Sequence, residues 1–176
     1  EIIINNQPID KTKDPESFGT GILGFGSVVM YGEPKSSYVR LASEALAGTN
    51  SFTLTGTPTN WRANDKLILP DTVQGSSGLS GDDYKAQLKP AILNLQTQSS
   101  TSVSFSPSLS KTFKSARNRA GTVQFHPHLG NLTRNVIIRS ESPTGTRGHI
   151  LFTHCADIHI CFVLFKDLGR TTIEPI

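Results

Sequence analysis

The sequence predicts an all-β protein whose last third forms a solenoid of stacked coils. Charged residues make up 18% of the 176 residues, which is below the usual quarter, and Ser, Thr, Gly, Asn and Pro fill the difference. Short apolar runs, many with a period of two, are separated by turn residues at intervals typical of β-rich folds. An apolar ladder in the last third recurs 27 residues further along the chain. We therefore expect a fragment of a solenoid-like extracellular protein, not a complete globular enzyme.

The strands predicted from these runs are short. They cover residues 27–31, 51–54, 66–69, 92–95, 102–105 and 122–125. The helical period is almost absent: a short helix is expected within 82–88, and residues 38–47 fit either a helix or a strand that leads to a turn. Residues 73–81 contain three Gly and three Ser and are expected to form a loop.

The ladder in the last third is the strongest indication of stacked coils. Leu132, Val136 and Ile138 alternate along the chain, and Val163 and Phe165 repeat the spacing of Val136 and Ile138. Between Ile160 and Val163 the spacing of the apolar residues shifts by one residue. In a continuous flat strand this shift would send the later apolar side chains to the opposite face. A corner at this point keeps both ladders inside, as in an architecture that buries its core by stacking neighbouring coils.

Basic residues are concentrated towards the end of the sequence. Residues 1–116 contain ten Lys and Arg and ten Asp and Glu, whereas residues 117–176 contain seven and four, together with all five His. An Arg- and His-rich β-surface suits carboxylates or sulfates, although it also fits an ordinary solvated face. The basic excess is too small, and too poor in aromatic residues, for nucleic-acid binding. No run of 18 apolar residues predicts a membrane span.

Two motifs give the sequence a family resemblance. Residues 26–32 (GSVVMYG) and 61–72 (WRANDKLILPDT) resemble the second half of an eight-glycine, or G-eight, domain. Residues 128–139 (HLGNLTRNVIIR) and 147–170 are similar to the right-handed parallel β-helix that follows it, a pectin-lyase-like solenoid. The pair occurs in cell-migration-inducing hyaluronan-binding proteins, in fibrocystin and in bacterial secreted proteins. The resemblance implies a G-eight-type β-domain over 1–125, incomplete at its N-terminus, and the first coils of a truncated β-helix over 126–176.

The sequence departs from the family pattern at a few positions. Asn64 stands where the family has Gly, and we expect Asn to keep the left-handed turn there. Trp61 should cover this motif, with Leu67 and Leu69 pointing inward. Cys155 and Cys161 do not form a disulfide framework and are expected to be separate thiols.

The histidines provide the candidate site. His126 and His128 are two residues apart and suit either the start of a metal site or a turn at the domain junction, but no third ligand lies nearby in the sequence. Further along, histidines, an aspartate and flanking arginines form a denser group, in which a carboxylate beside an imidazole can orient it as a base. The predicted substrate-binding residues are Arg147, His149, His154, Asp157, His159 and Arg170. They also fit a simpler role, in which Asp157 closes a turn and His154 and His159 lie on the outer surface.

These patterns predict a non-catalytic segment of an extracellular or cell-surface protein that binds acidic polysaccharide, hyaluronan-like by resemblance, and that stacks against the remainder of its own β-helix. The alternatives are a structural or adhesive scaffold, or part of a glycoside hydrolase whose catalytic groups lie outside this sequence. No phosphate-binding loop, nucleophile motif or zinc spacing is present, so no cofactor or metal is expected.

Overall fold

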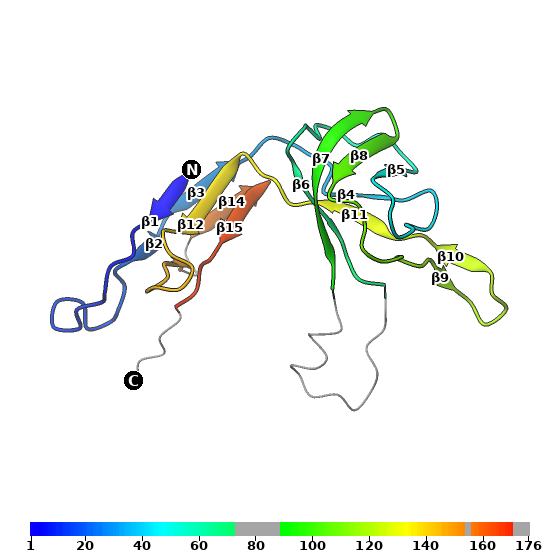
Figure 1. Cartoon of the computed structure of the whole chain (residues 1–176). Coiled ribbons are helices and arrows are strands. Elements are labelled where there is room, and N and C mark those ends of the chain that lie inside the picture. The colour runs from blue at the N-terminus through cyan, green and yellow to red at the C-terminus, as the bar shows by residue number, and fades with distance from the viewer. Residues whose placement is uncertain (73–88, 154–155, 171–176) are drawn as a thin grey trace. The chain divides into compact units, whose positions relative to one another are not determined.

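The chain forms two compact units, and the second is inserted into the first. The computed structural model describes residues 1–72, 89–153 and 156–170. The first unit, the coil unit, contains residues 1–33 and 134–176, and the second, the inserted unit, contains residues 34–133. Both consist of strands, and the described residues contain no helix (Figure 1). The predicted all-β class is confirmed. The predicted helix within 82–88 and loop 73–81 lie outside the described residues.

The coil unit is built from short strands that pair in parallel. They are β1 (Ile2–Ile4), β2 (Gly21–Gly24), β3 (Ser27–Tyr31), β12 (Val136–Ser140), β13 (His149–Phe152), β14 (Asp157–Cys161) and β15 (Val163–Lys166). They form three separate parallel sheets, ordered β1-β12-β15, β2-β13 and β3-β14. Each strand from the beginning of the chain therefore lies beside one from the end of it. One coil therefore stacks on the next, and β15 begins a third coil on β12. A longer β-helix and its right-handed sense remain predictions.

The 27-residue ladder aligns as predicted. Val136 pairs with Val163 and Ile138 pairs with Phe165 in the β12–β15 register. The corner expected between Ile160 and Val163 lies at Phe162, whose φ is 56° and which separates β14 from β15. Ile138 is fully buried at the centre of its sheet.

The division of the chain differs from the predicted domains 1–125 and 126–176. Residues 1–33, assigned from the sequence to the G-eight-type domain, form the first coil because β1, β2 and β3 pair with β12, β13 and β14. The inserted unit continues to residue 133. Stacking of coils joins segments about 130 residues apart, and a pattern that is local in the sequence does not reveal such pairing.

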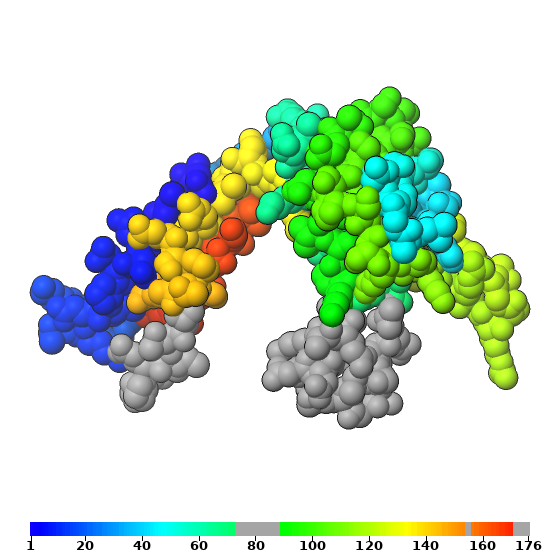
Figure 2. Space-filling model, in the orientation of Figure 1, coloured from blue at the N-terminus to red at the C-terminus, as the bar shows by residue number. Residues whose placement is uncertain are grey.

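The inserted unit is a six-stranded antiparallel sheet that curls on itself. The six strands of this sheet are β4 (Tyr38–Arg40), β5 (Ser51–Thr53), β6 (Lys66–Leu69), β7 (Ala91–Ser99), β8 (Ser102–Ser106) and β11 (His128–Asn131), and the unit also contains β9 (Ala116–Arg117) and β10 (Val123–Phe125). The sheet order is β4-β11-β6-β7-β8-β5. Hydrogen bonds from Ala42 N to Thr53 O and from Thr55 N to Arg40 O join its two edges. The strands β9 and β10 form a separate hairpin, which projects as a narrow arm (Figure 2).

The core of the inserted unit contains the residues that the Trp motif predicted. Trp61 is 4% exposed, and Leu67 and Leu69 are fully buried. Asn64 has a φ of 71°, so it takes the left-handed conformation expected where the family has Gly. The segment 38–47, which fitted either a helix or a strand, begins with β4 and continues through isolated bridges at Leu41 and Ala45.

A buried ion pair ties the two ends of the inserted unit together. Asp65 Oδ2 lies 2.7 Å from Lys35 Nζ, and both side chains are less than 10% exposed. The same oxygen accepts hydrogen bonds from Asn131 Nδ2 at 2.7 Å and from Arg62 N at 3.0 Å. Lys35 and Asn131 lie near the entry and the exit of the unit, so this network holds the two connecting segments side by side.

Candidate functional site

The basic excess of the chain lies in the inserted unit. Residues 34–133 contain ten Lys and Arg against five Asp and Glu, whereas the rest of the chain contains seven against nine. The basic residues that follow residue 117 in the sequence are therefore shared between the two units. In the coil unit they are offset by the acidic residues of the first coil. The acidic residues of the inserted unit that the structure describes are all engaged: Glu44 with Arg117, Asp65 with Lys35, and Asp71 with Lys111.

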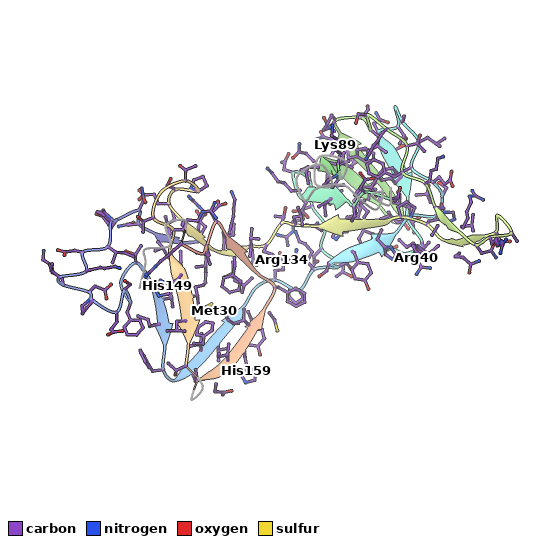
Figure 3. The ribbon with its side chains drawn as sticks, turned by 90° about the horizontal axis from the view of Figure 1, so that it is seen from below. Met30, Arg40, Lys89, Arg134, His149 and His159 are labelled. Carbon is purple, nitrogen blue, oxygen red and sulfur yellow. The ribbon has the colours of Figure 1, made fainter. Side chains whose placement is uncertain are left out.

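An aromatic and basic surface lies on two paired strands of this unit. In β4 and β11, Val39 and Leu129 are opposite each other and turn towards the core, whereas the alternating residues turn outward. The outward residues are Tyr38, Arg40 and His128, and Arg40 is the register partner of His128. We call this surface the β4–β11 face; Arg40 is labelled in Figure 3.

Three rings gather at this face. Tyr38 and His128 meet edge to face with their ring centroids 5.5 Å apart, and the ring centroid of Phe125 lies 6.4 Å from that of His128. Tyr38 is 65% exposed and Phe125 is 51% exposed. Rings this exposed contribute little to a core, and they present apolar faces on the surface to which Arg40 also belongs.

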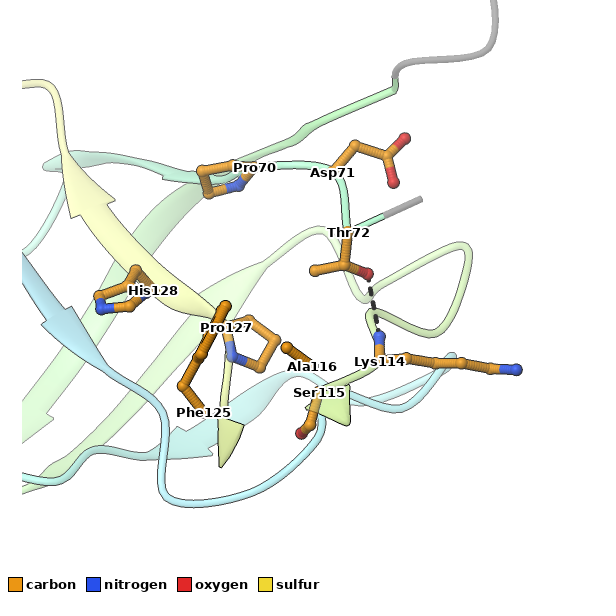
Figure 4. Close-up of a pocket in the computed structure, with 9 residues that line it drawn as sticks. All are labelled: Pro70, Asp71, Thr72, Lys114, Ser115, Ala116, Phe125, Pro127 and His128. Carbon is orange, nitrogen blue, oxygen red and sulfur yellow. Dashed lines mark hydrogen bonds between the residues drawn. The ribbon is translucent and has the colours of Figure 1, made fainter. Parts of the chain in front are cut away.

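A cavity of about 310 Å³ adjoins the face. His128 and Phe125 belong to its lining, together with Pro70, Asp71, Thr72, Lys114, Ser115, Ala116 and Pro127 (Figure 4). The Thr72 hydroxyl accepts a hydrogen bond from Lys114 N at 3.0 Å, and Ser115 Oγ lies 2.6 Å from His126 Nδ1. The cavity is thus continuous with the β4–β11 face through His128 and Phe125.

The coil unit brings two of the predicted site residues together in a structural contact. Arg170 Nη2 lies 3.2 Å from His149 Nδ1 and donates to the backbone oxygens of Ser17 and Gly19. Burial, and after it the charge of Arg170, lowers the pKa of His149, which favours the neutral form of its imidazole. The Nη2 group of Arg170 therefore holds the segment that precedes β2.

The other predicted site residues form no common cluster with this pair. Asp157 Oδ1 lies 3.2 Å from His159 Nε2 on β14, and both side chains are more than half exposed. His149 is on β13 and His159 on β14, which belong to different sheets (Figure 3). Arg147 Nε donates to Pro143 O at 2.7 Å in the turn before β13. His154 lies outside the described residues.

In the part of the chain that the structure describes, no group of three metal-ligating side chains forms around His126 and His128. His126 contacts Ser115, and His128 contacts Tyr38 and Phe125. The pair does not mark a domain junction either, because it connects β10 to β11 within the inserted unit.

Sequence reasoning missed the β4–β11 face. Tyr38 and Arg40 lie in the segment that fitted both a helix and a strand, so their shared face was not assigned. The only local signal is the alternation of Tyr38, Val39 and Arg40, which places the first and third side chains on one side of a strand. The proximity of β4 to β11 follows from the sheet pairing alone.

Known proteins give limited guidance. No known family and no curated protein matches the sequence. Three solved tailspike structures are similar to it. The tailspike gp49 of Pseudomonas phage LKA1 is 16% identical with a TM-score of 0.41, and the match covers 72% of this chain and 18% of gp49. The tailspike gp61 of Pseudomonas phage phi297 is 11% identical with a TM-score of 0.40, and the match covers 93% of this chain and 22% of gp61. The tailspike gp54 of Acinetobacter baumannii bacteriophage AP22 is 15% identical with a TM-score of 0.40, and the match covers 77% of this chain and 18% of gp54. The last was solved in complex with A. baumannii capsular saccharide.

The chain spans about a fifth of the length of these tailspikes. The likeness is too distant to assign a ligand, and the kinship with G-eight domains and hyaluronan-binding proteins stays a prediction. Among the described residues, no helix has the length and hydropathy to cross a membrane.

Proposed function

We propose that this chain is a non-catalytic segment of a secreted or cell-surface protein and that it binds acidic polysaccharide through the β4–β11 face. The observation that carries the proposal is the pairing of Tyr38, Arg40 and His128 on one outward surface. A hyaluronan-like polymer is the ligand that the family resemblance implies, and the geometry is compatible with uronate polymers in general.

The side chains of this face match the two halves of an acidic sugar. The apolar C–H faces of a pyranose stack on exposed aromatic rings, which are amphipathic and lose little conformational entropy on binding. A carboxylate or sulfate on the same or the next ring pairs with the guanidinium fork of Arg40, which is fixed in geometry and always charged. The surplus of basic residues in the inserted unit adds long-range attraction for a polyanion.

Arg40→Ala tests the proposal. We expect it to weaken the binding of hyaluronan and of polygalacturonate by about 10-fold, because a charge-assisted hydrogen bond is lost. Isothermal titration calorimetry at low and at high salt measures this, and the salt dependence of the affinity should fall in the variant. Tyr38→Ala should weaken binding by a similar factor of about 10 through lost stacking.

The matched control is Arg119→Ala, which removes the same charge from the same unit. Arg119 is exposed and lies in the turn between β9 and β10, away from the β4–β11 face. Equal losses in Arg40→Ala and Arg119→Ala would mean that net charge alone attracts the polymer. A folded chain that binds no acidic glycan would leave the structural or adhesive scaffold as the better reading.

The residues predicted from the sequence are a second candidate contact surface on the coil unit. Arg147, His159 and Asp157 are accessible there, whereas His149 and Arg170 contact each other. We expect Arg147→Ala to lower polygalacturonate affinity by less than Arg40→Ala does, roughly two-fold, because its Nε is engaged by Pro143 O. The same titrations measure it, and a larger loss than in Arg40→Ala would place the main contact on the coils.

A further inference from the structure

The cavity beside the β4–β11 face has mainly apolar walls. Pro70, Pro127, Ala116 and Phe125 supply rings and methyl carbons, and these residues surround the hollow in Figure 4. At about 310 Å³ the cavity is at the small end of the volumes that bind ligands. It is larger than the packing defects that remain inside well-packed proteins.

Three polar side chains of the lining make contacts within the protein. Asp71 lies 2.5 Å from Lys111 Nζ, so its charge is compensated. Ser115 Oγ shares a hydrogen bond with His126 Nδ1. The Thr72 hydroxyl accepts from Lys114 N, and that bond does not use the hydroxyl proton. The cavity therefore offers apolar contact together with a hydroxyl donor, and the side chain of Lys114 extends away from Thr72 (Figure 4).

This lining differs from the neighbouring face in the chemistry that it accepts. A carboxylate would lose its hydration among prolines and a phenyl ring, which is costly, and the Lys114 side chain extends away from Thr72 (Figure 4). An acyl group carries an apolar methyl and a carbonyl oxygen, and the carbonyl suits the donor of Thr72. Phe125 and His128 belong both to the cavity and to the aromatic cluster, so one sugar ring can lie on the face while its substituent enters the hollow.

We propose that this cavity is a subsite for an uncharged, acyl-bearing sugar ring, such as an acetamido or O-acetylated pyranose, next to the acidic ring bound at Arg40. The proposal rests on the proposed function, since the subsite selects among the polysaccharides that the β4–β11 face binds. The inserted unit then recognises acylation as well as charge.

Two neutral tetrasaccharides with the same backbone test the subsite. Chitotetraose and cellotetraose differ in carrying an acetamido group or a hydroxyl at C2. We expect the whole chain to bind chitotetraose about 10-fold more tightly than cellotetraose, which is the discrimination that a small apolar group in a fitted pocket provides. Because neither ligand is charged, the preference should not change with salt.

The variants Ala116→Leu and Phe125→Ala locate the preference. Ala116→Leu fills the cavity and should bring chitotetraose affinity down to that of cellotetraose, while binding of non-acetylated polygalacturonate stays as in the native chain. Phe125 is half exposed, so Phe125→Ala should leave the fold intact and also remove the preference. The matched control is Phe18→Ala, which removes a ring of similar exposure, 48%, from the coil unit. Its tetrasaccharide affinities should equal those of the native chain.

The outcomes separate the subsite from the proposed function. Equal affinity for the two tetrasaccharides, or a preference that survives both cavity variants, overturns the subsite even if polygalacturonate binds. A preference for chitotetraose that the cavity variants remove, without any binding of polygalacturonate, supports the subsite and overturns the acidic ligand. Absence of binding to every glycan overturns both.

Discussion

Asp65→Asn is expected to lower the free energy of unfolding of the inserted unit by about 3–5 kcal/mol. The amide nearly keeps the size of the side chain but removes its charge, which leaves the ammonium of Lys35 buried without a counter-charge. The Asn131 amide and the backbone N–H of Arg62 also lose a charged acceptor.

Urea unfolding followed by tryptophan fluorescence measures this effect. The sequence has one Trp, and Trp61 is buried in the inserted unit, so the signal reports on that unit. Glu44→Gln is the matched control: it removes the same charge from a pair with Arg117 that is much more exposed. It should cost about 1 kcal/mol or less. Similar costs for the two variants would contradict the importance of the buried network.

The same network predicts how stability depends on pH. Burial by itself raises the pKa of Asp65, but the hydrogen bonds from Lys35, Arg62 N and Asn131 outweigh it and leave the pKa below its ordinary value of 3.8. The carboxylate therefore stabilises the fold fully above that ordinary value, and the contribution is lost as the pH falls through the lowered pKa. In urea unfolding at decreasing pH, the native protein should lose this contribution to the free energy of unfolding. The Asp65→Asn variant, which has no carboxylate at this position, should show no such loss.

Gly32→Ala is expected to destabilise the coil unit by about 2–3 kcal/mol, the usual cost of forcing atoms into a packed site. Gly32 is buried directly after β3, and its N–H donates to Cys161 O at 2.9 Å. A Cβ at this position would collide with the backbone oxygen of Phe162 and would lie 2.9 Å from Asn135 Oδ1. The obstacle is the Phe162 backbone, and a backbone oxygen cannot move aside as a flexible side chain can.

Hydrogen exchange over residues 27–31 and 157–161 measures the effect, because opening of the β3–β14 pairing exposes these amides. Gly26→Ala is the control at the other end of β3, where an added Cβ meets nothing within 4 Å. Exchange in Gly26→Ala should match the native chain, and exchange in Gly32→Ala should be faster. If both variants exchange like the native chain, the coils do not meet closely at Gly32.

Local side-chain patterns in the sequence determined much of the secondary structure. The two-residue period predicted β3, β6 and the register of Val136 and Ile138 with Val163 and Phe165, since a one-residue slip would turn these side chains out of the interior. The Trp motif predicted the burial of Trp61 and the left-handed turn at Asn64. Such features depend on neighbouring residues and are therefore readable without a fold.

Only the tertiary structure decided which distant segments meet. The first coil pairs with strands that follow the whole inserted unit. As a result, the excess of basic residues lies in the inserted unit and not in the last third of the sequence. Arg170 was a candidate for anion binding, but the fold places it against Ser17 O, Gly19 O and His149. Tyr38 and His128 become one surface because β4 and β11 are neighbours. The pairing of remote strands depends on how the whole chain buries its core. A local sequence pattern does not contain this information, and it therefore does not locate the candidate site.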